Sequence, residues 1–437
     1  MTRTSRSDSV GGIGQATGGG DEQIGGTSTV VAHPADRYAE PLVSRIASEL
    51  GELGPLGWQR LHAVFALTVT VESARVEFTG AQRPVRLEVP ESVVALVRRY
   101  RADTAASGTE PWWRLLLRAN AYGDVEVDYD YGDEPFPADQ LFRPEAYRAD
   151  VAAYPRPRLP VWLAAYMGHR DRQCRRPRRA VAAALVDRAH GVTARPVDPE
   201  LPAFPQLWAR WAMISAAHVA VSSDRGPRVV PSNGWFESGG NGSSGSTLYA
   251  VPGGRAVLSG GVWDAPALNA AYNGGIDLPN LYAGAPDWVT NAVLSPRAAV
   301  GLLSFCYWWD GQRWYCGESP SVQQCGVAMP EIWQSHTVIE TVARLLSGDP
   351  GTRSRSAVAR LLTAAEHGEI AGELLVDTFG HEADLEAATR QLSAAGLFTP
   401  RPNRIHAANR WPEPVCTSMP GFHLSDGRRP FDDRIVR

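Results

Sequence analysis

The chain has 437 residues, of which 44% are hydrophobic and 21% are charged, and its formal net charge at pH 7 is −4. These values are typical of a globular protein with two or three domains, and they give no global reason to expect a nucleic-acid partner. All 43 basic residues are arginine, which excludes lysine Schiff bases and lysine-containing phosphate-binding loops.

The sequence carries no recognisable targeting or metal-binding signal. The N-terminal stretch "MTRTSRSDSVGGIGQATGGG" lacks the apolar segment of a secretion signal. The longest nearly apolar run, residues 298–309, is shorter than the ~20 residues that a membrane span needs. We therefore expect a cytoplasmic, reduced protein with no metal and no cofactor. Its five cysteines have neither CxxC nor zinc spacing and are Cys174, Cys306, Cys316, Cys325 and Cys416.

The first 190 residues predict a tail followed by an α+β domain. Residues 1–35 are rich in Gly, Ser and Thr and are expected to be disordered. Within residues 36–190, "RYAEPLVSRIASEL" and "VPESVVALVRRYRAD" have helical spacing, whereas "VFALTVTVESARVEF" and "RLLLRANAYGDVEVDYDYGDE" are typical of hairpins. A further helix is expected near Val161. This order favours an antiparallel sheet with flanking helices.

An acidic strip is predicted in the second of these hairpins. If Gly123 and Asp124 form a two-residue turn, Glu126, Asp128 and Asp130 share one face of the strand and lie opposite Ala119 and Ala121. Such a face would be exposed to water and strongly negative. It is either a solvated surface or a docking surface that attracts a basic partner.

A short basic run follows at residues 169–180, "HRDRQCRRPRRA", with six arginines around a proline. The run could be a patch for nucleic acid or an acidic partner. It could also be a solvated linker or helix end. We favour the second interpretation, because the run is isolated and has no interleaved aromatic residues of the kind that bind single strands.

The remainder of the chain predicts a second α+β domain at 200–347 and a small helical unit at 353–400. A helix with Leu207, Trp208 and Trp211 on one face is followed by a flexible Ser/Gly/Asn loop at 238–246 and a hairpin across Gly253-Gly254. Three short helices are expected in 353–400 and an extended tail in 401–437. The predicted fold class is thus α+β, with two antiparallel-sheet domains with flanking helices and a C-terminal helical unit.

The stretch "SFCYWWDGQRWYCGESP", residues 304–320, predicts an aromatic hairpin with a two-residue Asp310-Gly311 turn. Alternation then places Cys306 and Cys316 on opposite faces, which excludes a disulfide between them. Trp308 lies opposite Arg313 in this register, a geometry that suits a cation–π contact. Because aromatic residues occupy both faces, the hairpin is either central in a sheet or has one face open to a partner. The candidate partner-binding residues of this face are Trp308, Arg313 and Tyr315.

An enzyme is the alternative interpretation of the second domain. Its pocket would contain Glu318, Cys316 or His336. A catalytic thiol needs a nearby cation, histidine or helix N-terminus to lower its pKa. Both cysteines of the hairpin are instead predicted in the middle of strands, so we assign no catalytic residue.

Two stretches of the sequence resemble known protein families. Residues 111–169, which begin "PWWRLLLRANAYGDVEVDYDYGDE", resemble actinobacterial polymorphic-toxin immunity proteins of the YezG-like group. Residues 255–320, which include "LNAAYNGGIDLPNLYAGAPDWV", are similar to the immunity factor of the tuberculosis necrotizing toxin. The resemblance implies a cytoplasmic protein without enzymatic activity that binds a secreted toxin domain and blocks its active site. The second resemblance implies an NAD-hydrolysing toxin. A scaffolding protein without a toxin partner is a third possibility.

Overall fold

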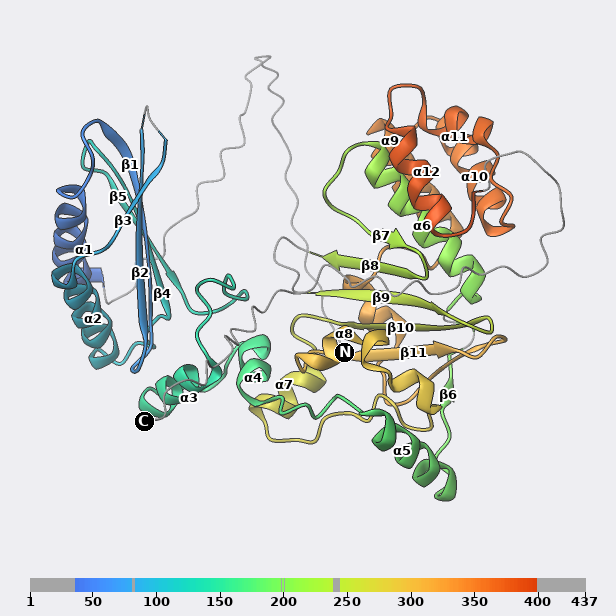
Figure 1. The fold of residues 1–437 in the computed structure, drawn as a ribbon, viewed down its shortest axis with the longest axis horizontal. Coiled ribbons are helices and arrows are strands. Elements are labelled where there is room, and N and C mark those ends of the chain that lie inside the picture. The colour runs from blue at the N-terminus through green and yellow to red at the C-terminus, as the bar shows by residue number, and fades with distance from the viewer. Residues whose placement is uncertain (1–35, 81–82, 198, 200, 239–243, 399–437) are drawn as a thin grey trace, which may run out of the picture.

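The computed structural model describes residues 36–398 except 81–82, 198, 200 and 239–243. These residues form two bodies, each built on an antiparallel sheet, as Figure 1 shows. The predicted α+β class is therefore confirmed. The tails expected at 1–35 and 401–437 lie outside the described residues. Within the described part of the chain, no helix combines the length and the apolar character required to cross a bilayer.

The first body contains a five-stranded sheet with the order β3-β2-β1-β4-β5. Every neighbouring pair is antiparallel, and the hairpins β1–β2 and β4–β5 supply four of the strands. The elements of this body are α1 (Asp36–Gly51), β1 (Trp58–Leu67), β2 (Glu72–Gly80), β3 (Val85–Leu87), α2 (Glu91–Ala106), β4 (Arg114–Asn120) and β5 (Val125–Asp130).

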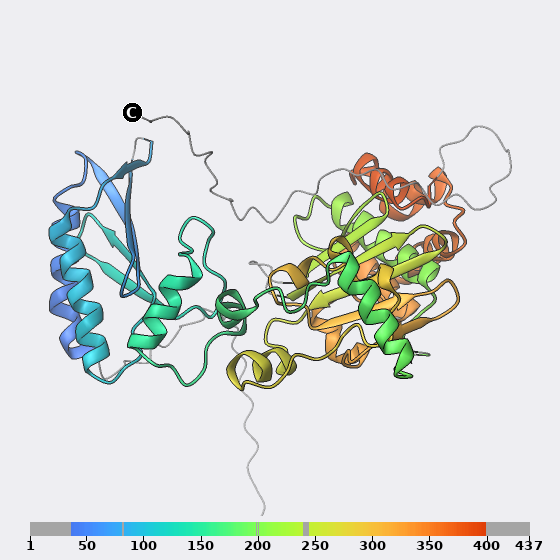
Figure 2. The same cartoon turned by 60° about the horizontal axis from the view of Figure 1, so that its bottom comes forward.

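Helices α1 and α2 cover one face of this first sheet. Leu61, Ala63 and Phe65 alternate along β1 and are buried in one core with residues of both helices, such as Ile46 and Val97. The intervening strand residues face the opposite side, because side chains alternate along a strand. In Figure 1 and Figure 2 the two helices lie on the outer side of the sheet, and its other face is turned toward the rest of the molecule.

Three helices link the two sheets. Asp150 on the first of them is fully buried and accepts hydrogen bonds from the Arg101 guanidinium, the Trp113 indole N–H and the Val69 amide. This one carboxylate therefore fixes the linking segment to α2, to the start of β4 and to the β1–β2 turn. The linking helices are α3 (Pro144–Ala153), α4 (Val161–Gly168) and α5 (Pro177–Ala189).

The second body contains a seven-stranded antiparallel sheet with the order β6-β12-β11-β10-β9-β8-β7. The strands are β6 (Arg195–Pro196), β7 (Arg228–Val230), β8 (Asn233–Ser238), β9 (Ser244–Val251), β10 (Arg255–Gly261), β11 (Phe305–Trp309) and β12 (Trp314–Cys316). The helical elements are α6 (Phe204–Ala220), α7 (Pro266–Asn273), η1 (Asp287–Thr290), η2 (Ala292–Leu294), α8 (Pro296–Ala299), η3 (Val322–Ala328), α9 (Ser335–Ser347), α10 (Thr352–Glu366), α11 (Gly372–Phe379) and α12 (Leu385–Ala394).

Helix α6 joins the C-terminal helices to the second sheet. One core contains Tyr307 of the sheet, Trp208 and Trp211 of α6, and Leu361 and Leu392 of the helices that follow residue 352. The Trp208 indole N–H also donates to the carbonyl of Ala395 at 2.9 Å. Residues 353–398 therefore pack on α6 as part of the second body, at the upper right of Figure 1.

The two glycine turns of the second sheet differ in how well the sequence describes them. The β9–β10 turn is as predicted: Gly253 and Gly254 both have positive φ, and Val251 pairs with Arg255. The predicted Asp310-Gly311 register is wrong by two residues, since Trp309 pairs with Trp314 and not with Gln312.

The cause of that shift is the Asp310 carboxylate. It accepts from the amides of Gln312 and Arg313 at 2.8 and 3.0 Å, which closes a four-residue turn over 310–313. Because the shift is by two residues, the faces are unchanged. Tyr307 and Trp309 remain on the α6 side, whereas Trp308 remains on the other.

Part of the segment expected to be a flexible loop is strand. Ser238 ends β8, and residues 244–246 begin β9. The expectation is wrong there because the serine hydroxyls are buried and hydrogen-bonded: Ser246 donates to the Ala328 carbonyl at 2.6 Å, and Ser244 accepts from the Trp263 amide at 2.9 Å. The rest of the predicted loop, 239–243, lies outside the described residues.

Candidate functional site

The face of the first sheet that α1 and α2 do not cover carries a ladder of alternating charges, one residue from each strand. Cross-strand pairing connects them in sequence from β3 to β5. Four of the five are exposed, and the Glu77 side chain is about a third exposed. We refer to this row as the charge ladder; its members are Arg86, Glu77, His62, Arg118 and Glu126.

The ion pairs of the charge ladder lie at its two ends. Arg86 Nε lies 2.6 Å from Glu77 Oε2, and Arg118 Nη1 lies 3.5 Å from Glu126 Oε2. Partial burial and the nearby Arg118 lower the pKa of His62, whereas Glu77 raises it. The imidazole is therefore neutral at pH 7, and the ladder alternates in sign without a large net charge.

The next row toward the centre of this face is apolar in the middle. The buried Val64 and the partly exposed Leu116 are neighbours there, and the row ends in the exposed side chains of Arg75 on β2 and Asp128 on β5. Arg75 also donates to the carboxylate and the carbonyl of Asp139, which holds the 131–142 loop over the inner end of the sheet. The exposed part of this face is therefore mainly charged, with the partly exposed Leu116 beside the charges.

This arrangement corrects the acidic strip predicted from the sequence. Glu126 and Asp130 lie opposite Arg118 and Arg114, and Asp128 lies opposite Leu116, so none of the three faces an alanine. The register differs because Asn120 Oδ1 accepts from the Tyr122 and Asp124 amides, which gives a longer turn than Gly123-Asp124 alone. The face is therefore mixed in charge and not strongly negative.

Asp130 differs from the other two acidic residues of the strip. It is half-buried, lies 2.9 Å from Arg114 and accepts from the Gly132 amide at 2.8 Å. Burial raises the pKa of Asp130, although the Gly132 amide and Arg114 act in the opposite direction. We infer that Asp130 holds the end of β5, whereas the exposed Glu126 and Asp128 are accessible to a partner.

The second set of predicted partner-binding residues lies on the other body. Trp308 is only 2% exposed, because the segment from Leu281 to Leu303 covers its face of the second sheet. Of the two alternatives for the hairpin, the structure therefore has the central one, and neither face is open. Arg313 is exposed in the turn, and Tyr315, partly exposed, occupies the position opposite Trp308. The predicted residues thus do not form one site.

The three residues of the enzyme alternative are also separated by their environments. Cys316 is buried in the α6-side core, Glu318 is exposed and accepts from the Asn280 amide at 2.6 Å, and His336 is exposed on α9. Burial raises the pKa of Cys306 and of Cys325 to about 12, so these thiols are protonated at neutral pH. Among the described residues, no group of three or more His, Cys, Asp or Glu side chains is placed to hold a metal ion.

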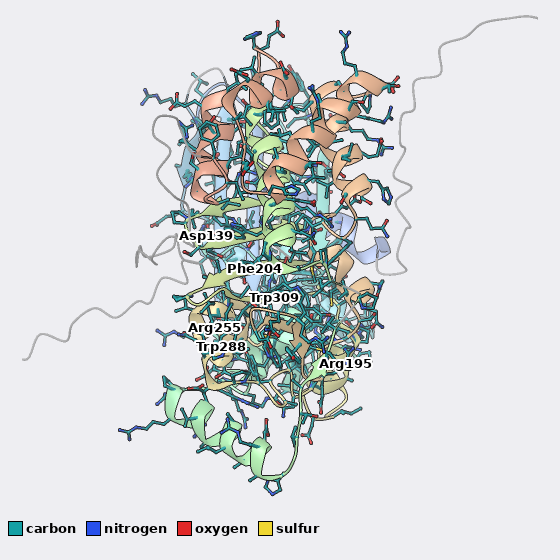
Figure 3. All side chains as sticks on the ribbon, turned by 90° about the vertical axis from the view of Figure 1, so that its right-hand side faces the viewer. Asp139, Arg195, Phe204, Arg255, Trp288 and Trp309 are labelled. Atoms are coloured by element: carbon teal, nitrogen blue, oxygen red, sulfur yellow. The ribbon has the colours of Figure 1, made fainter. Side chains whose placement is uncertain are left out.

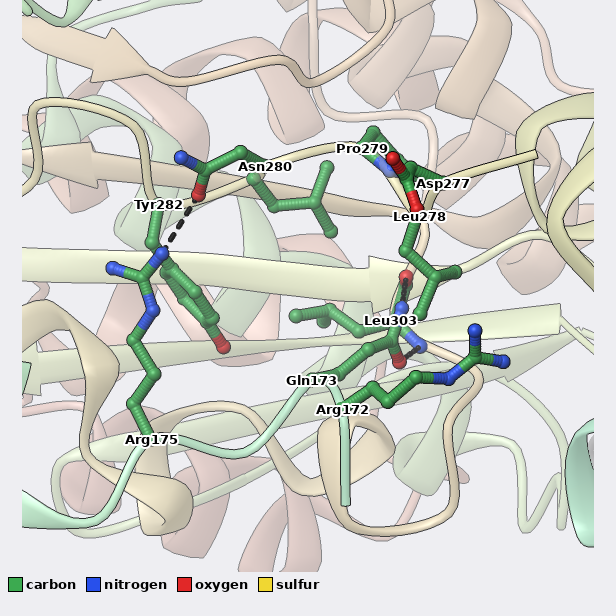
Figure 4. A pocket seen from close by; sticks show the side chains of 10 residues that line it. Arg172, Gln173, Arg175, Asp277, Leu278, Pro279, Asn280, Tyr282 and Leu303 are labelled. Atoms are coloured by element: carbon green, nitrogen blue, oxygen red, sulfur yellow. Dashed lines mark hydrogen bonds between the residues drawn. The ribbon is translucent and has the colours of Figure 1, made fainter. Parts of the chain in front are cut away.

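A cleft of about 410 Å³ lies where the basic run crosses the second body. Figure 4 shows Arg175 beside Tyr282 at one end and Arg172 at the other. Arg175 donates to Asn280 Oδ1 at 2.8 Å, and its guanidinium lies 5.2 Å from the Tyr282 ring centre. The lining also includes the exposed Asp277, the partly exposed Leu278 and the buried Leu281 and Leu303.

Gln173 anchors the basic run beside this cleft. Its buried side-chain amide donates to the Leu303 carbonyl at 2.7 Å and accepts from the Leu303 amide at 2.9 Å. The preceding Arg170 and Asp171 have φ of 46° and 54°, a left-handed conformation that costs non-glycine residues about 1–3 kcal/mol each. The arginines of the basic run are visible in the sequence. The residues that hold the run in place, Asn280 and Leu303, are more than a hundred positions away and could not be predicted from it.

No protein-family model matches this chain. No curated protein matches it at a significant level.

Proposed function

We propose that this chain is an immunity-type inhibitor that binds a secreted toxin domain and covers its active site. The observation that carries the proposal is the open face of the first sheet, where the charge ladder lies beside the partly exposed Leu116 and the exposed Asp128. Specific protein interfaces combine an apolar centre with a polar border, and alternating charges select one partner and one register.

The family resemblance directs the choice of partner. The part of the chain that resembles immunity proteins of the YezG-like group, residues 111–169, includes β4 and β5, which carry Arg118, Glu126 and Asp128. The resemblance of residues 255–320 suggests an NAD-hydrolysing toxin as the first partner to test. An inhibitor of this kind acts in the cytoplasm of the cell that produces it.

The direct test is co-expression of the full chain with the toxin domain encoded beside it. Rescue of growth and copurification of a complex are expected. If the chain gives neither, the proposed function is wrong.

An exchange of two charges tests the docking surface. Arg118→Glu alone breaks the pair with Glu126, whereas Arg118→Glu/Glu126→Arg restores a pair of opposite orientation. An exposed pair at 3.5 Å is worth ~1 kcal/mol or less, so both variants should fold and melt like the natural chain. Both should lose affinity for the toxin, because the partner faces the reversed pattern. Unchanged affinity of both variants would show that the ladder is only solvated surface, and full rescue by the exchanged pair would show that the pair acts within the sheet and not on the partner.

The acidic end of the face can be tested through binding rates. Glu126→Gln/Asp128→Asn leaves Asp130 and its structural contacts in place. Association should slow and lose salt dependence, with a smaller change in dissociation, because border charges act mainly on the on-rate. The matched control is Glu373→Gln/Glu382→Gln, which removes two exposed carboxylates from α11 and from the turn before α12. Identical on-rates for both variants at low and high salt would contradict the proposed role.

A further inference from the structure

Almost all side chains of helix α5 are exposed or only partly buried, although the helix has thirteen residues. Only Ala180 is buried, whereas Val181, Leu185 and Val186 are 45%, 56% and 54% exposed. Figure 1 and Figure 3 both show α5 projecting from the second body, to which its inner side is attached near η1. Its attachment includes a hydrogen bond from the Gly284 amide to the Asp187 carboxylate at 2.9 Å.

The exposed apolar side chains form one stripe. Val181 and Leu185 are four residues apart, as are Ala182 and Val186, so each pair is adjacent on the helix surface. Helices in proteins gain most of their stability by burying an apolar face. A contiguous apolar stripe left exposed marks an interaction surface more often than isolated apolar residues do.

The surroundings of the stripe are strongly basic. Residues 170–192 contain seven arginines and two aspartates, which gives a net charge of +5 with histidine neutral. Asp187, the carboxylate of α5, is engaged with the Gly284 amide on the inner side. Arg178, Arg179 and Arg188 are exposed. A partner that covers the apolar stripe must therefore present negative charge beside its own apolar residues.

The cleft described above lies just before the first residue of α5 and also contains arginines. Arg175 forms one end of the cleft and precedes the first residue of α5, Pro177, by two positions. Between Arg172 and Arg175 the cleft is lined by the partly exposed Leu278 and by Asp277. The two arginines of the cleft thus extend the basic surface of α5, and carboxylates of a partner could pair with them.

We propose that α5 and the adjoining arginines dock an acidic amphipathic helix of a protein partner. A nucleic acid would leave the apolar stripe uncovered, since phosphate contacts need only the arginines. The proposal does not depend on the inhibitor function, because the charge ladder lies on the other body.

The probe is a fluorescein-labelled peptide of 18 residues with leucines at helical spacing on one face and glutamates on the other. Fluorescence anisotropy with the full chain measures its affinity at low and high salt. A peptide of the same composition with the leucines distributed around the helix should bind about tenfold more weakly or worse, because it cannot match the stripe.

Variants separate the apolar and the charged contributions. Leu185→Ser should weaken binding of the matched peptide about tenfold, whereas Val327→Ser, at a site of equal 56% exposure on η3, should not change it. Arg178→Gln/Arg179→Gln should weaken binding and reduce its salt dependence. Arg118→Glu/Glu126→Arg should leave peptide binding unchanged, because it alters only the charge ladder. Failure of the α5 proposal and failure of the proposed toxin binding can therefore be distinguished. Circular dichroism melts verify that each variant folds.

Several results would overturn the proposal. One is equal affinity for the matched and the scrambled peptide, or no binding of either. Another is Leu185-dependent binding to phosphatidylglycerol vesicles without peptide binding, which would assign the stripe to a membrane surface. A third is a dimer in sedimentation velocity that Leu185→Ser dissociates, which would make a second copy the occupant.

Discussion

Replacement of Asp150 by alanine should destabilise the first body more than any surface substitution. The carboxylate is completely buried and accepts two hydrogen bonds from Arg101 Nη2, at 2.9 and 2.7 Å, and one each from Trp113 Nε1 and the Val69 amide. Arg101 is itself only 5% exposed. Its remaining polar contact is a hydrogen bond from Nε to the Trp112 carbonyl, and its guanidinium lies 5.4 Å from the Tyr154 ring centre.

The size of the effect follows from what Asp150→Ala leaves behind. Breaking a buried ion pair from one side costs ~3–5 kcal/mol, because the remaining charge is buried without compensation. Two orphaned N–H donors, on Trp113 and Val69, add to this cost, although the contributions of contacting groups are not additive. A loss of at least ~4 kcal/mol is a large part of the ~5–15 kcal/mol that stabilises a typical protein.

A second substitution tests the reasoning itself. If the orphaned charge causes most of the loss, Arg101→Met/Asp150→Ala should be more stable than Asp150→Ala alone by ~1–3 kcal/mol, because an apolar side chain replaces the unpaired cation. Hydrogen exchange measured by mass spectrometry should report lower protection in α2 and β4 of the single variant, with the second sheet as internal control. Equal or lower protection in the double variant would refute the argument.

The remaining predictions concern thiols and pH. Cys306 and Cys325 should resist iodoacetamide at pH 8 in the native protein, since their pKa values of about 12 leave almost no thiolate. Among the four cysteines that the structure describes, the partly exposed Cys174 should be alkylated first in peptide maps, and comparable labelling of Cys306 would contradict the described burial. Burial and Arg228 lower the pKa of the His218 imidazole below 6.5, so the unfolded chain binds this proton more readily than the folded one. Stability should be lost as the pH falls from 6.5 through the lowered pKa, and His218→Gln should melt with a smaller change between pH 7.5 and pH 5.

The sequence predicts the strands and their faces better than it predicts their partners. Alternation alone assigns Tyr307 and Trp308 correctly to opposite sides of the second sheet, and this assignment survives a register error of two residues. The turns at Asn120 and Asp310 could not be read from the glycines that follow them, because in each case a side-chain oxygen accepts from backbone amides and lengthens the turn.

The candidate sites depend on residues that are distant in the chain. The arginines opposite Glu126 and Asp130 depend on the β4–β5 register, and the ladder requires β3, β2 and β1 beside them. The segment that covers Trp308 has no regular periodicity, so no pattern in the sequence indicates that Trp308 is buried. The exposure of Leu185 could not be predicted either, because helical spacing indicates an apolar face but not whether the fold covers that face.

The enclosure of α6 has a consequence for how the protein is made. Most of this helix is buried, and part of its cover is α12, whose last residue, Ala394, is made 174 residues after Ala220, the last residue of α6. At synthesis rates of about 5–20 residues per second, an apolar helix with two buried tryptophans waits roughly 10–40 seconds for that cover. Nascent chains that end before residue 352 lack α10 to α12 altogether. Such chains are expected to bind chaperones or to aggregate, because α6 stays exposed. The newly made molecule therefore becomes stable in the cell only after the C-terminal helices have covered α6.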